Sequence, residues 1–173
     1  GIRMIFRNLG LLRDDPLNFF ILLAVISVAL LIAITIHEFS HALAANYFGD
    51  ETAKRQGRLS LNPLVHLDPI GTLMLLFVGF GWGKPVPVNA YRLHRKQMAA
   101  VAFAGPLSNL VFVALVFLPF RLGNFMPPEL LVYILFFSII LAIFNLIPIP
   151  PLDGFNILLG FLPARLNNQA YKF

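Results

Sequence analysis

The sequence predicts an all-α polytopic membrane protein, on the evidence of its composition, its long apolar runs and the prolines that separate them. Of its 173 residues, 58% are hydrophobic and only 12% are charged, which is far from the balance of a soluble globular domain. Such a chain has too little polar sequence to cover a surface in water. We therefore expect one domain, 1–173, with three core transmembrane helices surrounded by a lipid bilayer.

The first predicted helix covers residues 17–48. Its first 20 residues, 17–36, contain only three polar side chains, and about 20 apolar residues are enough to cross the hydrocarbon core. Good helix formers continue without a breaker to Gly49, a residue typical of a helix C-cap. The helix should therefore be longer than the bilayer is thick, with residues 37–48 near one membrane face.

Residues 49–96 are predicted to form a loop, a re-entrant segment and a short β segment. The apolar run 72–80 is too short for a spanning helix and is typical of a re-entrant or interfacial element. Residues 82–89 alternate Val with Pro and Lys, which favours an extended or edge-strand segment. We expect both ends of this region to lie at the same membrane face.

The second and third spans are predicted at 97–120 and 129–147. The third span ends in the proline-rich stretch that begins at Pro148, because proline cannot continue a helix. The remaining residues, 148–163, contain a Leu-Asp-Gly sequence and a short apolar helix over 155–162. This last piece is interpreted as a half-helix or a truncated fourth span.

Positive charge predicts the orientation and argues against some partners. If 49–69 and 84–97 share a face, that face carries seven Lys or Arg, against Arg121 alone between the later spans. The positive-inside rule makes the rich face cytoplasmic. A net charge of +5 without a recognisable motif gives no reason to expect a nucleic-acid partner. The chain has no cysteine, so any metal must be bound by histidines and carboxylates.

The sequence His37-Glu38-Phe39-Ser40-His41 is an H-E-x-x-H motif. On a helix, positions i and i+4 lie on one face, so both imidazoles can reach one zinc ion with Glu38 beside them as a general base. An accidental match is disfavoured, because three ionisable side chains near the end of a membrane helix are costly unless they are functional.

A catalytic zinc site needs a third protein ligand. A metzincin would have Gly and His where this chain has Ala44 and Tyr47, so that class is excluded. Four candidates remain: Asp153, Asp68, His66 and His94. Asp153 is favoured because it lies in a proline-broken stretch between apolar segments, where irregular backbone must line a protein cavity. The alternative for Asp153 is an exposed turn residue.

Together these residues resemble the site-2 protease family of intramembrane zinc metalloproteases. The family's N-x-x-P-x-x-x-x-D-G motif is matched at Asn145, Pro148, Asp153 and Gly154, beside the H-E-x-x-H motif. The sequence Ala-Gly-Pro-Leu-Ser-Asn at 104–109 is also similar to a family segment. The resemblance points to the compact bacterial and archaeal subgroup without a PDZ domain.

This resemblance implies that His37, His41 and Asp153 bind Zn²⁺, with Glu38 as the catalytic base. It implies an integral multi-pass protein of a prokaryotic cytoplasmic membrane that cleaves transmembrane segments of single-pass or membrane-anchored proteins at its cytoplasmic side. A metal-binding transporter and a non-catalytic membrane scaffold are the alternatives.

Four further side chains are candidates for the site. Three of them have a second, structural interpretation. Asn109 is either a second catalytic residue near the scissile carbonyl, as an oxyanion donor, or a helix-packing asparagine. His66 and Asp68 are either a loop pair beside the prolines or part of a lid or auxiliary metal site. Asn145 is an auxiliary candidate from the family motif.

Overall fold

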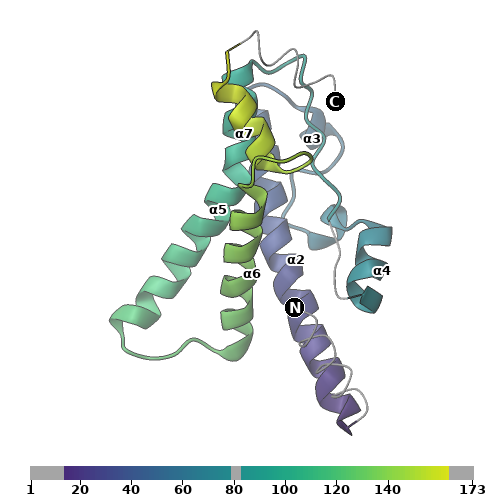
Figure 1. The fold of residues 1–173 in the computed structure, drawn as a ribbon, viewed down its shortest axis with the longest axis vertical. Helices are drawn as coiled ribbons and strands as arrows, with labels where there is room; N and C mark the ends of the chain where they lie inside the picture. Colours follow the sequence, from purple (N-terminus) through teal and green to yellow (C-terminus); the bar gives the residue numbers. More distant parts are fainter. Residues whose placement is uncertain (1–13, 79–82, 164–173) are drawn as a thin grey trace.

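A computed structural model describes residues 14–78 and 83–163 of the chain (Figure 1). Within these ranges the protein is mostly helical and contains no β-strand. Its elements, in chain order, are α2 (Pro16–Tyr47), α3 (Thr52–Arg55), the 3₁₀ helix η1 (Pro63–His66), α4 (Pro69–Val78), α5 (Arg95–Leu122), α6 (Glu129–Asn145) and α7 (Asp153–Phe161).

Helix α2 has clear start and stop signals. The Asp15 side chain accepts a hydrogen bond from the Asn18 backbone N–H at 3.2 Å, and Pro16 occupies the first turn, where its missing N–H is no loss. The helix ends just before Gly49, whose φ of +93° is favourable only for glycine. Its 32 residues make a rod about 48 Å long, longer than a hydrocarbon core of about 30 Å.

By length and composition, α2 and α5 can each cross a membrane, whereas α6 is a shorter apolar helix of 17 residues. Helix α5 extends two residues beyond the predicted 97–120 at each end. Helix α6 covers 129–145 and so ends two residues before the predicted boundary. Helix α7 begins at Asp153, two residues before the predicted start of the last apolar piece.

Helices α2, α5 and α6 pack against one another, and α7 packs against α5 (Figure 1). Small side chains allow the helices to approach closely. Ala33 of α2 and Ala142 of α6 are fully buried, and so is Asn109 of α5. At the other end, α5 and α6 diverge toward the loop 123–128 that joins them (Figure 1).

Residues 83–89, here called the strap, have extended backbone but do not form the predicted strand. In the described part of this segment, the β-type backbone pairing is limited to one isolated antiparallel bridge between Leu67 and Gly83. A second contact nearby is the hydrogen bond from the Lys84 N–H to the His66 carbonyl, at 2.8 Å. Pro85 and Pro87 lack the N–H that a ladder requires, which explains the absence of a strand. Trp82 and the end of the 72–80 run, residues 79 and 80, lie outside the described residues.

Candidate metal centre

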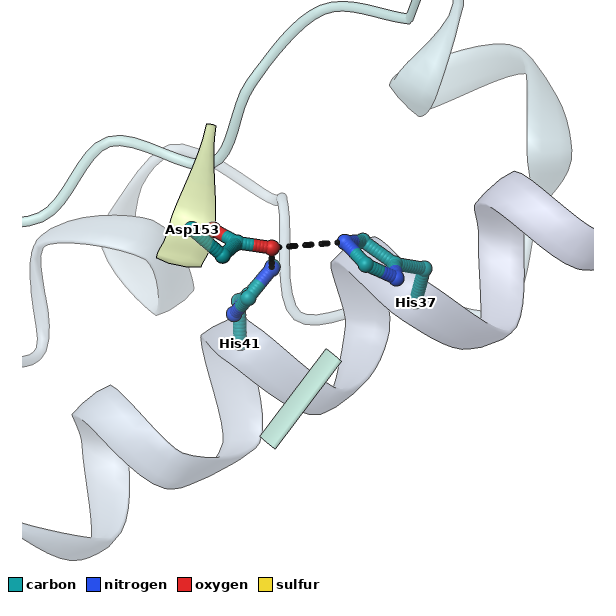
Figure 2. Close-up of side chains that lie close together, drawn as sticks. All are labelled: His37, His41 and Asp153. Carbon is teal, nitrogen blue, oxygen red and sulfur yellow. Dashed lines mark hydrogen bonds and ion pairs between the residues drawn. The ribbon is translucent and has the colours of Figure 1, made fainter. Parts of the chain in front are cut away.

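The structure brings His37, His41 and Asp153 together (Figure 2). His37 Nε2 lies 3.0 Å and His41 Nε2 lies 3.1 Å from the same carboxylate oxygen, Asp153 Oδ2. The two imidazole rings are 4.7 Å apart and nearly perpendicular. Both histidines are buried, and the Asp153 side chain is 19% exposed. Asp153, which lies 112 or more positions along the chain from the histidines, therefore joins them in presenting three potential ligand atoms to one point.

The tautomer of His41 follows from its second nitrogen. His41 Nδ1 lies 2.7 Å from the Val101 carbonyl oxygen, and because a carbonyl can only accept, Nδ1 must carry the proton. In the neutral ring, Nε2 then presents a lone pair to the Asp153 carboxylate. Two lone pairs at 3.1 Å repel unless a proton or a cation lies between them. A backbone carbonyl that orients the far nitrogen in this way is typical of metal-binding histidines.

The donor set fits zinc. Zinc prefers tetrahedral sites with imidazole and carboxylate ligands at about 2.0–2.2 Å, so neighbouring donors lie roughly 3.3–3.5 Å apart. The separations of 3.0 and 3.1 Å from the two imidazole nitrogens to the carboxylate oxygen are close to this spacing, and all three atoms lie within 4.8 Å of one another. With three protein ligands, one coordination position would stay open, as in catalytic zinc sites.

Two glycines let the helices close around these side chains. A Cβ atom added at Gly105 of α5 would lie 2.6 Å from His41 Cε1 and 2.8 Å from His37 Nε2. A Cβ atom at Gly154 would lie 2.5 Å from the Ile147 carbonyl oxygen. Gly105 thus lets α5 approach the imidazoles, and Gly154 lets α7 begin against the end of α6. The role of Gly105 was not predicted, although Gly-Pro within a helix was a visible signal.

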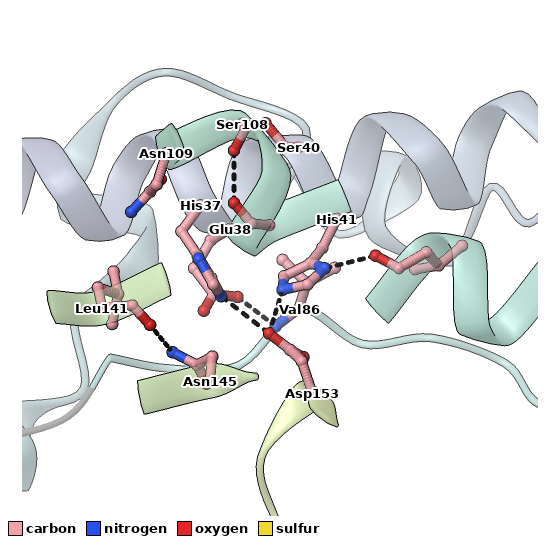
Figure 3. A network of polar contacts seen from close by, with 12 residues as sticks. His37, Glu38, Ser40, His41, Val86, Ser108, Asn109, Leu141, Asn145 and Asp153 are labelled. Atoms are coloured by element: carbon pink, nitrogen blue, oxygen red, sulfur yellow. Dashed lines mark hydrogen bonds and ion pairs between the residues drawn. The ribbon is translucent and has the colours of Figure 1, made fainter. Parts of the chain in front are cut away.

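Glu38 faces the strap (Figure 3). Its Oε2 accepts a hydrogen bond from the Val86 backbone N–H at 3.0 Å, and the side chain belongs to the same helical turn as His37. One carboxylate oxygen is thereby held by the strap. The Val86 amide was not predicted as part of the site, because a backbone donor leaves no mark in the sequence.

Asn109 lies one turn from Gly105 and is fully buried. Its Nδ2 donates to the carbonyls of Ala33 at 3.3 Å and Ser138 at 3.4 Å, so the side chain connects α5 to both α2 and α6. In Figure 3 it lies apart from the Asp153 carboxylate. These contacts are the ones that the helix-packing interpretation predicts. To act as an oxyanion donor, the amide would have to break one of these two hydrogen bonds.

The remaining candidates lie in local networks outside the three-residue cluster. His66 is buried, and its Nε2 is 2.8 Å from the Ser60 carbonyl. Asp68 accepts from the Gly71 N–H at 2.8 Å, next to the start of α4. His94 caps α5, and Asn145 donates to Leu141 of its own helix at 2.9 Å.

Two more side chains, neither of them predicted, hold the strap. Buried Asp50 accepts hydrogen bonds from the Asn89 N–H at 2.7 Å and from Thr52. Burial acts to raise the pKa of Asp50, but these hydrogen bonds outweigh it and leave the pKa below its usual value. Arg58 donates to carbonyls of the strap. The strap is therefore bound by charged side chains that lie on either side of α3.

Two histidines and a carboxylate around one point, with a glutamate next to the first histidine on the same helix, define the class of site that zinc hydrolases use. Its two histidines lie on α2, a helix long and apolar enough to cross a membrane. The class indicated by the geometry is therefore a membrane metallohydrolase.

Comparison with known proteins agrees with this class. A sequence profile described as "Peptidase family M50" matches residues 123–172. The chain is 42% identical over 149 residues to "Putative zinc metalloprotease YwhC" of Bacillus subtilis, and the aligned region covers 79% of this chain and 68% of that protein. It is 34% identical over 149 residues to "Putative zinc metalloprotease MJ0611" of Methanocaldococcus jannaschii, with coverage of 82% and 73%. No solved structure matches the chain.

A third relative is "Putative zinc metalloprotease Rip2" of Mycolicibacterium smegmatis, 30% identical over 168 residues, with coverage of 91% of this chain and 63% of that protein. The chain spans about two thirds of the length of the relatives it matches. By these similarities it belongs to peptidase family M50, the site-2 protease family of peptide-bond hydrolases. The family resemblance inferred from the motifs is confirmed.

Proposed function

We propose that this protein is a zinc-dependent intramembrane endopeptidase that cleaves transmembrane segments of membrane-anchored proteins. The observation that carries the proposal is that His37 Nε2 and His41 Nε2 each lie within hydrogen-bond distance of Asp153 Oδ2, beside Glu38. The orientation of His41 is consistent with the proposal, because the lone pair that faces the carboxylate calls for a proton or a cation between them. The names of the relatives include zinc and protease activity.

In this proposal His37, His41 and Asp153 hold the ion, which supplies a Lewis acid that polarises the scissile carbonyl and acidifies water. Glu38 accepts a proton from the attacking water and delivers it to the leaving amine. One oxygen of Glu38 is held by the Val86 N–H, so the carboxylate keeps its orientation while its other oxygen handles the proton. The Val101 carbonyl keeps His41 Nε2 free to act as a ligand.

The proposed membrane arrangement has α2, α5 and α6 as spans. Helix α6 has 17 residues, about 26 Å of helix, which is at the lower limit for crossing a hydrocarbon core. The bridge between Leu67 and Gly83 supports a re-entrant path for the intervening chain, since that chain leaves and returns at one place. The basic segments around it favour the cytoplasmic side for the site.

The strap is the proposed docking edge for an unwound substrate, which would bind by strand addition. A helical substrate must unwind first, because a hydrogen-bonded helix hides its carbonyls. The Val86 N–H is already bonded to Glu38, so Val88 is the better candidate to pair with a substrate. Replacing Val88 by Pro should raise KM about tenfold or more, since one backbone donor is lost. Unchanged KM in a cleavage assay with a model transmembrane substrate would remove the docking proposal.

The main test compares zinc content and cleavage in three purified proteins in detergent. The unaltered chain should hold one zinc per molecule and cleave a model substrate. Asp153→Ala should lose both zinc and cleavage. Glu38→Gln should keep its zinc and lose cleavage by about a hundredfold or more, the usual contribution of a general base.

Two outcomes would contradict the protease. Stoichiometric zinc without cleavage across a substrate panel would point to the scaffold. Zinc transport across vesicles by the unaltered chain, reduced in Glu38→Gln, would point to the transporter.

A further inference from the structure

Arg58 is a buried cation whose role neither the motifs nor the zinc site explains. Its residue is only 5% exposed, although arginine is rarely buried without a reason. Within the described residues its guanidinium makes no ion pair at contact distance; it donates instead to the carbonyls of Val65, Lys84 and Pro85. Burial lowers the pKa of Arg58, and the charge of Glu38 acts in the opposite direction.

The choice of arginine suits these contacts. The planar guanidinium presents several N–H groups in a fixed fork, so one side chain can hold carbonyls from two chain segments at once. Here the fork joins the end of η1, through Val65, to the strap, through Lys84 and Pro85. Lysine, with a compact ammonium on a flexible stem, cannot reproduce that geometry.

Arg58 and Glu38 form hydrogen bonds to opposite sides of one peptide unit, the one that joins Pro85 to Val86. The Pro85 carbonyl accepts from Arg58 Nη2 at 3.2 Å, and the N–H on the other side of the same peptide bond, that of Val86, donates to Glu38 Oε2 at 3.0 Å. A peptide unit is planar and rigid. Whatever fixes its oxygen therefore fixes the direction of its N–H.

Pro85 adds to the constraint. Its ring locks φ near −65°, so on that side the peptide plane that follows it can turn only about ψ of Pro85. Hydrogen bonds in a chain also polarise one another. A cation at the oxygen and an anion at the N–H of one peptide unit strengthen each other.

We propose that Arg58 is a positioning residue for the reaction: by holding the Pro85–Val86 peptide unit, it keeps the Val86 N–H on Glu38 and so orients the general base. The inference rests on the proposed function, because it assigns Glu38 that role. It predicts an effect on turnover that does not pass through zinc binding.

The first measurement does not need activity. Because prolines flank Val86, its amide is the one exchangeable backbone group between Lys84 and Val88, and hydrogen exchange can follow it in protein labelled with ¹⁵N-valine and ¹⁵N-asparagine. In Arg58→Ala the Val86 amide should exchange at least tenfold faster, while the Asn89 amide, held by Asp50, should change less than twofold. Unchanged Val86 exchange, or equal loss of protection at both amides, would overturn the proposal.

The second measurement is turnover of the zinc-loaded protein. Arg58→Ala should keep its zinc and lose roughly tenfold to a hundredfold in kcat, the usual effect of losing hydrogen bonds to a charged group, and Arg58→Lys should recover part of it. The matched control is Arg55→Ala, since the Arg55 side chain is 70% exposed and, among the residues that the structure describes, bonds to Glu51 alone.

These outcomes separate the two proposals. A purely structural Arg58 would reduce the folded yield but leave kcat of the folded, zinc-loaded fraction unchanged, and a change confined to KM would place its effect on substrate binding. Either result overturns the positioning role. If the unaltered chain cleaves no substrate, the proposed function fails while the exchange experiment still decides whether Arg58 holds the peptide unit.

Discussion

The two ends of the helix bundle differ in what surrounds their side chains. At the end that carries the candidate metal site, the helices meet through small or polar residues, and Ala33, Ala142 and Asn109 are fully buried. At the opposite end the helices diverge and their apolar side chains face outward, with Leu17 70% and Leu122 75% exposed. The close contacts between the helices are thus concentrated at the end of the bundle near the site, while the other end is splayed and apolar.

This difference shows where the chain requires particular residues. Membrane helices gain little from burying apolar groups against one another, because lipid is equally apolar, so close packing relies on small residues and hydrogen bonds. Both are concentrated around the site. The far end has to be only apolar and helical, so substitutions should have very unequal effects at the two ends.

The largest effect is expected at Gly105. Gly105→Ala places a methyl group against both imidazoles, so α5 must move away from α2 or the histidines must turn. We expect zinc affinity to fall about tenfold to a hundredfold, as it does when the surroundings of metal ligands are disturbed, and cleavage to fall with it. Competition with a chelator measures the affinity. Leu107→Ala, on the same helix but 43% exposed, is the control, and equal affinities in the two variants would refute the steric argument.

The next effect tests Asn109. Its amide links three helices, so Asn109→Ala should lower the free energy of unfolding by about 1–3 kcal/mol, the cost of leaving buried partners unsatisfied. Reversible unfolding in mixed detergent provides the measurement. If stability is unchanged while kcat falls a hundredfold, the oxyanion interpretation replaces the packing one.

The smallest effect is expected at the far end. Leu115 is 68% exposed, so Leu115→Ala should change the free energy of unfolding by less than about 0.5 kcal/mol and leave cleavage unaltered. Ala33→Leu, a change of similar size at the packed end, should cost about 1–3 kcal/mol through overpacking. Comparable losses in the two variants would show that the ends do not differ in the way their exposure indicates.

Much of the candidate site could be predicted because its chemistry is recorded in residue types and spacing. His37 and His41 share a helical face by virtue of their separation alone. Asp153 was identified because a carboxylate in a proline-broken apolar stretch has few other uses. Their role as zinc ligands remains a prediction, while the zinc metalloprotease class is that of the named relatives.

Other parts could not be predicted, for physical reasons. The bonds from Arg58 to Pro85 and from Val86 to Glu38 use backbone groups, which every residue possesses. Their partners are set by tertiary structure over separations of 27 and 48 residues. The strap was expected to be a strand because its alternating valines favour extended backbone, but its prolines remove the donors that a strand partner would need.

The bridge between Leu67 and Gly83 also has a consequence for how the sequence can vary. The bridge ties together the two ends of the segment 68–82, so the chain between them is a closed loop. The entropic cost of closing such a loop rises only slowly with its length. Doubling it costs about 0.6 kcal/mol. The protein can therefore accept insertions or deletions in this loop without moving Glu38 or the peptide that holds it, which makes the loop the natural place for length differences to accumulate.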